Sequence, residues 1–99
     1  MVIVWSKPAR EDLHSIHQFI ARDSKLYANR VTQDILAKVD VLAIMPKLGR
    51  TVSEIGEENV REIGVYSYRI LYEIIGETLY IHGVIHKRRD FKQEDLQRE

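Results

Sequence analysis

The sequence predicts an α+β fold with elements in the order β-α-α-β-β-β. Two apolar stripes at helical spacing follow one another in the first half of the chain. The second half contains runs of β-branched and aromatic residues, which favour strands. A Gly-Glu pair separates the last two runs and fits a two-residue hairpin turn. A helical hairpin packed on a small sheet accounts for these three observations.

The amino-acid composition excludes several kinds of protein and several kinds of site. The 99 residues suit one domain, with 44% hydrophobic and 30% charged side chains. The 15 basic and 15 acidic residues cancel, so any site for a polyanion has to be a local patch. The absence of cysteine excludes disulfides, thiolate zinc sites and cysteine nucleophiles. The longest apolar runs have five residues and no secretory signal is visible, so we expect a cytoplasmic protein without a membrane span.

The N-terminal part predicts a strand followed by a helix. Residues 2–5 form a short apolar run that is typical of a buried strand. Ser6 or Lys7 is expected to cap the following helix, because Pro8 suits a first helical turn. The apolar stripe of this helix consists of Ala9, Leu13, Ile16 and Ile20.

A second helix follows directly. Asp23 and Ser24 are expected to end the first helix and to cap the next one. Pro46 should stop the second helix, because the residue before a proline is disfavoured in the helical conformation. The apolar face of this helix consists of Ala28, Val31, Ile35, Val39 and Leu42. Two amphipathic helices with a tight connection form a hairpin whose apolar face needs a sheet.

Three strands are expected in the remainder of the chain, over residues 60–63, 66–75 and 78–86. The chain after these strands is mostly charged. We therefore expect a single domain over residues 1–91 and a polar C-terminal tail over residues 92–99.

The turn at Gly76 and Glu77 fixes a register that predicts which side chains share a face. One face of the hairpin is then apolar and suits the helices, with Ile74 opposite Leu79, Tyr72 opposite Ile81, Ile70 opposite Gly83 and Tyr68 opposite Ile85. The opposite face, which the helices leave uncovered, carries Arg69, His82 and His86. Arg69 and His86 are expected to be diagonal neighbours about 7–8 Å apart.

Cationic and imidazole side chains gather near the end of the last strand: Arg69, His86, Lys87, Arg88 and Arg89. Cleavage of a phosphodiester through the neighbouring 2′-hydroxyl needs a base, an acid and cations that stabilise the intermediate. Histidine can transfer protons near neutral pH, and arginine donates a planar fork of hydrogen bonds to phosphate oxygens. The cluster is typical of a phosphate site, and also of a solvated basic strand end that binds an acidic partner.

The histidines do not predict a metal site. His82 and His86 share a strand face but lie about 13 Å apart, too far to hold one ion. His14 and His17 stand three positions apart on the first helix, with no third ligand that clearly completes a site. No Gly-rich nucleotide loop occurs, so we predict neither a metal nor a cofactor.

Three further residues are candidates for binding. Tyr80 falls on the uncovered face, where a nucleic-acid base could stack on it. Arg61 and Glu62 lie where the short strand joins the sheet. Glu62 could accept a proton near the site, but an ion pair at the rim or towards the helices is the favoured role. The alternation does not determine which of the two residues points into the uncovered face.

A series of short motifs runs along about nine-tenths of the chain: Val4-Trp5-Ser6, Pro8-Ala9, Asp12-Leu13, Ile20-Ala21-Arg22-Asp23, Pro46-Lys47-Leu48-Gly49-Arg50, Val60-Arg61-Glu62-Ile63, Tyr68-Arg69-Ile70-Leu71-Tyr72 and Val84-Ile85-His86-Lys87-Arg88-Arg89-Asp90. Together these motifs resemble the RelE/ParE superfamily of toxins from bacterial type II toxin–antitoxin modules. The Tyr-Arg-x-x-Tyr strand and the His-x-Arg-Arg-Asp ending are the most specific.

The resemblance implies a β-α-α-β-β-β fold with a mostly antiparallel sheet, and one of two activities. RelE-like members are ribosome-dependent endonucleases that cut mRNA. In that branch Arg69 and Arg88 would contact the phosphate, and His86 would transfer a proton. ParE-like members are not nucleases and inhibit DNA gyrase. The resemblance also implies a cognate antitoxin, which would lay an extended or helical segment over the grooves of the toxin and fold as it binds.

Several residues favour the ParE-like branch. No tyrosine follows Tyr80, whereas many nuclease members carry one near the C-terminus. Val60 and Glu62 stand where lysines are often found, and the net charge is zero. We therefore expect a toxin that inhibits DNA gyrase by binding, with a RelE-like mRNA endonuclease and a non-toxic or repressor member as alternatives. The candidate binding residues are Arg61, Glu62, Tyr80, His82, Lys87 and Arg89.

Overall fold

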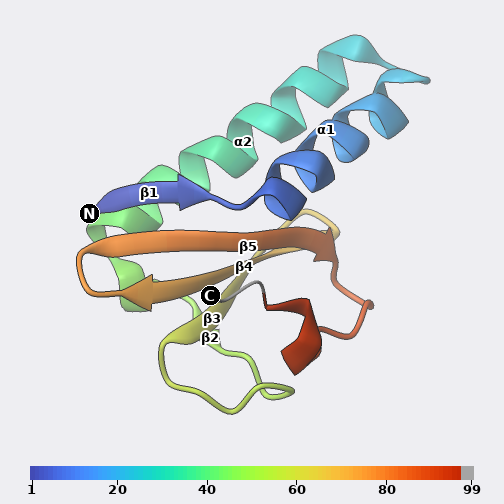
Figure 1. Cartoon of the computed structure of the whole chain (residues 1–99). Coiled ribbons are helices and arrows are strands. Elements are labelled where there is room, and N and C mark those ends of the chain that lie inside the picture. Colours follow the sequence, from blue (N-terminus) through green and yellow to red (C-terminus); the bar gives the residue numbers. More distant parts are fainter. Residues whose placement is uncertain (97–99) are drawn as a thin grey trace.

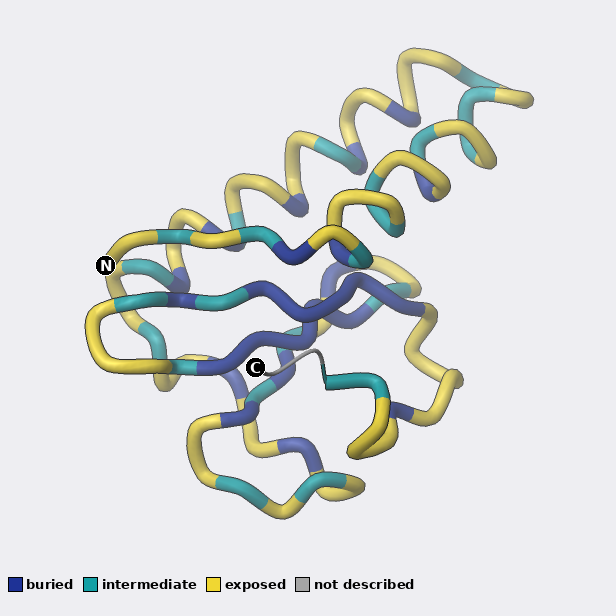
Figure 2. The backbone as a smooth tube through the Cα atoms, in the orientation of Figure 1, coloured by how far each residue is buried: buried dark blue, intermediate teal, exposed yellow. Residues whose placement is uncertain are grey.

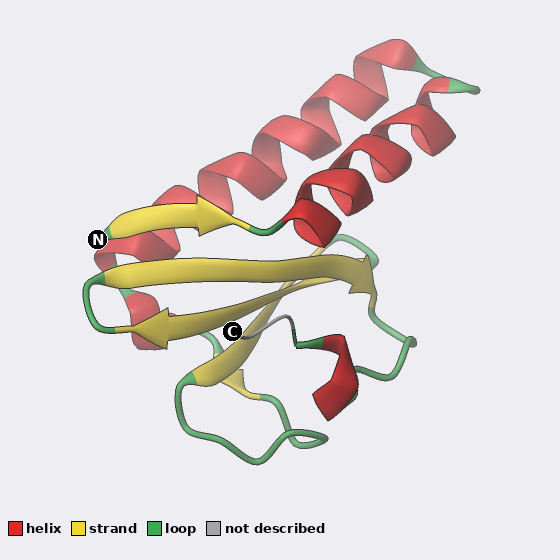
Figure 3. Ribbon diagram, in the orientation of Figure 1, coloured by secondary structure: helices red, strands yellow, loops and turns green. Residues whose placement is uncertain are grey.

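Two helices cover one face of a five-stranded sheet (Figures 1 and 3). The structure is a computed structural model of the chain and describes residues 1–96. The elements are, in order, β1 (Val2–Trp5), α1 (Lys7–Ala21), α2 (Lys25–Ile44), the 3₁₀ helix η1 (Pro46–Leu48), β2 (Arg50–Thr51), β3 (Val60–Val65), β4 (Tyr68–Ile75), β5 (Thr78–His86) and the 3₁₀ helix η2 (Gln93–Asp95). This order confirms the predicted α+β fold, to which the short strand β2 is an addition.

The strands lie in the order β1-β5-β4-β3-β2. β1 runs parallel to β5, and the other three pairs are antiparallel, so the sheet is mostly antiparallel as expected. A parallel pair needs a long crossover, and here both helices and three strands lie between its two members. β1 and β2 are the edge strands.

Side chains at the predicted positions cap both helices. Ser6 Oγ accepts a hydrogen bond from the backbone N–H of Ala9 (3.1 Å), and Ser24 Oγ accepts one from Tyr27 (3.0 Å). α2 ends before Pro46, as predicted. No helix in the described part of the chain combines the length and the apolar character needed to cross a bilayer.

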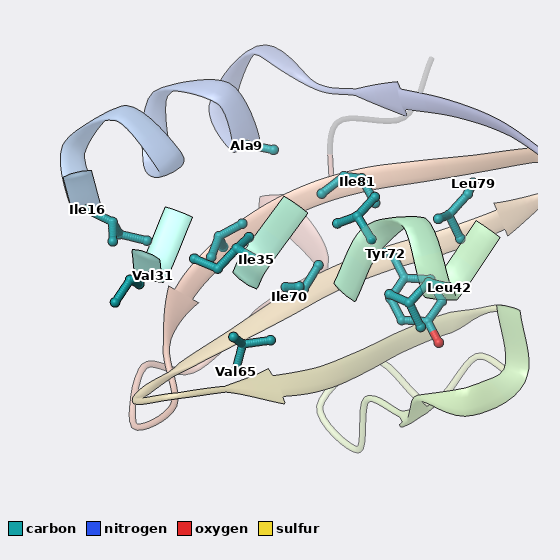
Figure 4. Packing of buried hydrophobic residues seen from close by; sticks show 12 residues of the cluster. Ala9, Ile16, Val31, Ile35, Leu42, Val65, Ile70, Tyr72, Leu79 and Ile81 are labelled. Atoms are coloured by element: carbon teal, nitrogen blue, oxygen red, sulfur yellow. The ribbon is translucent and has the colours of Figure 1, made fainter. Parts of the chain in front are cut away.

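The helices bury their apolar faces against the sheet (Figure 4). The helix-side core consists of Ala9, Ile16, Val31, Ile35, Val39, Leu42, Val65, Ile70, Tyr72, Leu79, Ile81 and Val84. Tyr72 is completely buried. Its hydroxyl donates to the carbonyl oxygen of Pro46 (2.7 Å) and accepts from the N–H of Gly49 (3.0 Å). These two bonds hold the turn after α2 against the sheet.

The β3–β4 turn is tied to α2 by Tyr66. This residue has a φ of 56° and is the one non-glycine residue in the described chain with a positive φ. Its hydroxyl donates to the carboxylate of Asp34, and its ring meets the edge of the Tyr27 ring at a centroid distance of 6.2 Å. Contacts with the helix therefore offset an unfavourable backbone conformation.

The β4–β5 hairpin turns at Gly76 and Glu77, as predicted, and Gly76 has a φ of 55°. The predicted register holds from this turn as far as Tyr72, which lies opposite Ile81. Beyond that pair the predicted register is wrong, because His82 is an extra residue in β5 and forms a β-bulge.

The bulge reverses the faces of the residues that follow it. Val84 joins the helix-side core, and Ile85 turns to the opposite side of the sheet. Asp12 of α1 accepts a hydrogen bond from the N–H of Val84 (3.0 Å). A Cβ at Gly83 would lie 3.2 Å from the same carboxylate oxygen. α1 therefore fixes the bulge, and Gly83 leaves the space that the carboxylate occupies.

The sheet face opposite the helices is covered, so the predicted uncovered face is wrong. A rear cluster of buried residues lies there: Val52, Val60, Leu71, Ile85 and Phe91. The loop between β2 and β3 and the segment after β5 cross this face (Figure 2). Of the predicted tail, η2 and Leu96 follow Phe91, and Leu96 packs on the rear cluster. Residues 97–99 lie outside the described residues.

Candidate functional site

Arg69 lies beneath the rear segments, and only 6% of the residue is exposed. Its guanidinium donates to Glu62 (3.1 Å), to Glu54 (3.0 Å) and to the carbonyl oxygen of Arg89. Burial alone would lower the pKa of Arg69, but the two carboxylates more than offset this effect and raise it. The hydrogen bond from Arg69 lowers the pKa of Glu54 to about 2. Arg69 is the charged centre of a largely enclosed ion-pair network.

His86 lies on the other side of the hairpin from Arg69. It stands opposite Tyr68 in the register, and the two rings meet edge to face at 6.2 Å. Tyr68 packs against the helix-side core, whereas Arg69 points to the rear. The prediction that Arg69 and His86 are neighbours on one face is therefore wrong. The bulge at His82 is the reason, because it shifts the alternation of β5 by one residue.

The structure does bring Arg88 close to Arg69. Residues 87–89, the basic turn, follow β5 and are exposed. The basic turn, Arg50 and Arg69 line one hollow of about 320 Å³. The stem of Lys87 extends over β3, where a Cβ at Gly64 would lie 3.0 Å from its Cε. The cationic side chains of the predicted cluster therefore line one hollow, and His86 is not among them.

His82 is enclosed, so its predicted place on an uncovered surface is wrong. The residue is 4% exposed, and its Nε2 lies 2.8 Å from a carboxylate oxygen of Glu73. Its ring lies 4.9 Å from the half-buried ring of Tyr80. The hydroxyl of Ser6 donates to the carbonyl oxygen of His82 (3.1 Å), so the cap of α1 also holds the bulge. His82 and Tyr80 thus form a packed polar group at the bulge.

Arg61 and Glu62 both hold β3 to its neighbours. Arg61 donates to the carbonyl oxygen of Gly49 (2.8 Å). Glu62 is 6% exposed, binds Arg69 and lies 3.5 Å from Arg50. Of the two interpretations of Glu62, the ion pair matches its contacts.

A groove of about 740 Å³ between β1 and the helices was not predicted. This β1 groove is lined by Ile3, Val4, Trp5, Arg10, Leu13, His14, His17, Thr32 and Leu36. Among these lining residues there is one arginine, there are two histidines, and none is acidic. β1 pairs only with β5 in the described chain, so its outer edge keeps free backbone donors and acceptors. The sequence feature that marks this groove is the wholly apolar run of residues 2–5. Such a run is unusual for a strand at the edge of a sheet.

Comparison with known proteins agrees with this architecture. A solved chain described as "Chromosomal ParDE TA system from P. aeruginosa" matches with a TM-score of 0.72 at 20% identity, covering 87% of this chain and 95% of that chain. No curated protein matches the chain at a significant level. Residues 3–91 match the family model described as ParE toxin of type II toxin-antitoxin system, parDE. The chain therefore belongs to the ParE family of toxins of type II toxin–antitoxin systems.

Proposed function

We propose that this chain is a toxin that inhibits DNA gyrase by binding it and does not cleave RNA. The observation that carries this choice is the enclosure of Arg69 between Glu54 and Glu62. The gyrase target follows from the ParE-like branch, whose members the resemblance describes as gyrase inhibitors.

RNA cleavage would need cations and a proton-transfer group that reach one phosphate together. Arg69 already donates to two carboxylates, and a phosphate would have to displace both. Removing the partner of a buried charge costs about 3–5 kcal/mol. Glu62 would keep only its 3.5 Å contact with the exposed side chain of Arg50. His86 stands opposite Tyr68, on the other side of the hairpin from Arg69, so the side chains of Arg69 and His86 do not point to one common site. These contacts support a binding protein over a nuclease.

The cognate antitoxin is proposed to occupy the β1 groove. An extended segment could pair with the free edge of β1, which supplies backbone hydrogen bonds in any sequence. Side chains of that segment would meet an apolar floor that includes Val4 and Leu36. Arg10, His14 and His17 favour carboxylates along the same segment. The occupant that fits this groove is an acidic segment with regularly spaced apolar residues.

Two parallel assays test the target. Purified protein is added to a gyrase supercoiling reaction and, separately, to ribosomes stalled on mRNA. We expect loss of supercoiling and intact mRNA. Cuts at fixed codon positions that disappear in Arg69→Ala and Arg88→Ala would overturn the proposal and establish the endonuclease.

The antitoxin site is tested with variants of the groove. Leu36→Glu and Arg10→Glu should weaken antitoxin binding by tenfold or more, because they place negative charge against an acidic segment. Leu26→Glu is the matched control, since Leu26 is 80% exposed and lies outside the groove lining. Equal affinity of all three variants, measured by titration calorimetry, would place the antitoxin elsewhere.

A further inference from the structure

The basic turn is the only run of three consecutive cationic residues in the sequence. All three residues are exposed. Within the described part of the chain, none of their cationic groups lies within 4.0 Å of a carboxylate. The surface residues Lys7 and Lys47, in contrast, do pair with carboxylates. The basic turn thus concentrates positive charge without a salt bridge on a molecule with no net charge. The charge of Arg89 acts at longer range on the carboxylate of Asp12.

The backbone of the basic turn is held at each residue. The N–H of Lys87 donates to the carbonyl oxygen of Ser67 (2.8 Å). The N–H of Arg88 donates to Nδ1 of His86 (3.2 Å), and that of Arg89 donates to the carbonyl oxygen of His86 (3.0 Å). His86 therefore shapes the turn from the side of the hairpin opposite Arg69.

Arg69 and Phe91 fix the far end of the turn. Arg69 donates to the carbonyl oxygen of Arg89, and Glu54, itself bound to Arg69, accepts from the N–H of Phe91 (3.3 Å). The side chain of Phe91 is buried in the rear cluster. A cationic surface with a fixed backbone loses little conformational entropy when it binds. The anchoring therefore presents the three cations on a backbone that is already ordered before any ligand binds.

We propose that the basic turn binds phosphate groups of the DNA duplex on which the target enzyme acts; this proposal rests on the function proposed above. Arginine presents forked donors that fit phosphate oxygens, and a duplex presents phosphates at fixed spacing to rigid cations. Thr51 lines the same hollow, and its hydroxyl can donate to a phosphate. Ser53 also lines it, but its hydroxyl donates to Glu54 (3.3 Å).

The carboxylates near the turn do not cancel its positive charge. Glu54 and Glu62 line the hollow, but both are engaged by Arg69. Asp90 directly follows the turn, is exposed and also lines the hollow, where it stands against the three cations of the turn and Arg50. Because the whole chain is neutral, the contact adds to binding chiefly where the target enzyme already holds both toxin and duplex. An acidic protein surface is the competing source of negative charge, and the experiment separates it.

The test compares two triple variants with the same change in charge. Lys87→Ala/Arg88→Ala/Arg89→Ala removes the cations but keeps the anchoring bonds, which involve backbone atoms of the turn. The control is a second triple substitution at exposed positions of the helical hairpin: Arg22→Ala/Lys25→Ala/Arg30→Ala. Far-UV circular dichroism and thermal melting check that both variants fold.

Direct binding is measured first, by fluorescence anisotropy with a short labelled duplex over a series of low salt concentrations. Three phosphate contacts predict that log K falls with log salt with a slope of roughly −2.7. We expect that slope for the wild type and the control variant, and a slope near zero for the basic-turn variant. Equal slopes for all three proteins would overturn the proposal. Competition by polyglutamate as strong as by duplex, at equal charge, would also overturn it.

Inhibition of supercoiling is measured second. The basic-turn variant should need about tenfold more protein than the control variant for half-inhibition, because its phosphate contacts are lost. Equal potency of the two variants overturns this inference and leaves the gyrase assignment intact. A third outcome is that only the basic-turn variant loses duplex binding while the wild type does not inhibit gyrase. That outcome supports phosphate binding and overturns the gyrase assignment.

Discussion

Gly49 lies in the turn after α2, where the backbone is in close contact with the sheet. A Cβ at this position would lie 2.5 Å from the carbonyl oxygen of Glu62 and 2.5 Å from the hydroxyl oxygen of Tyr72. Its φ is −73°, so the requirement for glycine is one of space and not of backbone conformation.

Gly49→Ala should therefore destabilise the protein by about 1–3 kcal/mol, the usual cost of overpacking a core. Thermal melting measures the loss, and in a domain of this size each kcal/mol lowers Tm by roughly 4–8 °C. Gly64→Ala is the control, because the only tight contacts of its Cβ would be with the flexible end of Lys87, and the backbone oxygen of Tyr68 would lie at an ordinary distance of 3.9 Å. A Tm of Gly49→Ala equal to that of the control would contradict the close approach.

Glu54 gives the ion-pair network a dependence on pH. Arg69 lowers its pKa from 4.5 to about 2, so the folded state releases this proton more readily than the unfolded state. Its contribution to stability is complete above pH 4.5 and is lost as the pH falls towards 2.

Glu54→Gln should lower the free energy of unfolding at pH 7 by about 1–3 kcal/mol, because a charged hydrogen-bond partner of Arg69 is lost. The difference from the wild type should shrink as the pH falls towards 2. Urea denaturation across this range measures both effects. Glu58→Gln is the control, since the Glu58 side chain is 74% exposed and its ion pair contributes little. A constant difference at every pH would be incompatible with this linkage.

Among the elements, the bulge in β5 determines which side chains face the helices. Asp12 holds the bulge by accepting the N–H of Val84. Burial is the main reason why the pKa of Asp12 is raised, and the hydrogen bond from Val84 partly offsets it. The folded state therefore binds a proton at Asp12 more tightly than the unfolded state, and this group becomes less favourable to folding as the pH rises through its pKa.

Asp12→Ala should cost about 1–3 kcal/mol, because it leaves a buried N–H without an acceptor. Asp12→Asn should cost less, since its amide oxygen can accept the same bond without a half-buried charge. Urea denaturation at pH 7 ranks the two variants. The opposite ranking would show that the carboxylate charge, and not its oxygen, holds the bulge.

The bulge also marks the limit of prediction from sequence at this scale. Helix ends follow from Ser6, Ser24 and Pro46, because caps and proline act locally. The register of β5 depends on one extra residue, and either register buries an apolar residue, Val84 or Ile85, beneath the helices. The pattern cannot distinguish the two.

Whether a sheet face is covered also depends on residues that are far apart in the chain. Phe91 and the loop after β2 reach the rear face through contacts that no periodicity encodes, so the enclosure of Arg69 could not be predicted. The cationic cluster itself could be predicted, because Lys87, Arg88 and Arg89 are adjacent in the chain.

At the scale of the whole molecule, two cores share one sheet. β4 contributes Ile70 and Tyr72 to the helix-side core and Leu71 to the rear cluster. Loss of either core should therefore weaken the other, and the molecule should unfold in one transition.

Phe91→Ala should cost about 3–5 kcal/mol, as expected for a large buried side chain. The fluorescence of Trp5, which packs against the helix-side core, should report the same lowered midpoint as far-UV circular dichroism. Lys92→Ala, at the exposed neighbouring residue, is the control. A Trp5 transition unchanged by Phe91→Ala would mean that the two cores unfold independently.

The parallel pairing of β1 with β5 has a consequence for synthesis in the cell. The contact between Ser6 and His82 spans 76 positions. β1 therefore has no strand to pair with until β5 has left the ribosome. Such distant pairing delays folding. A nascent chain that lacks β5 therefore cannot pair β1, and both the β1 groove and the basic turn take shape only after β5 has emerged.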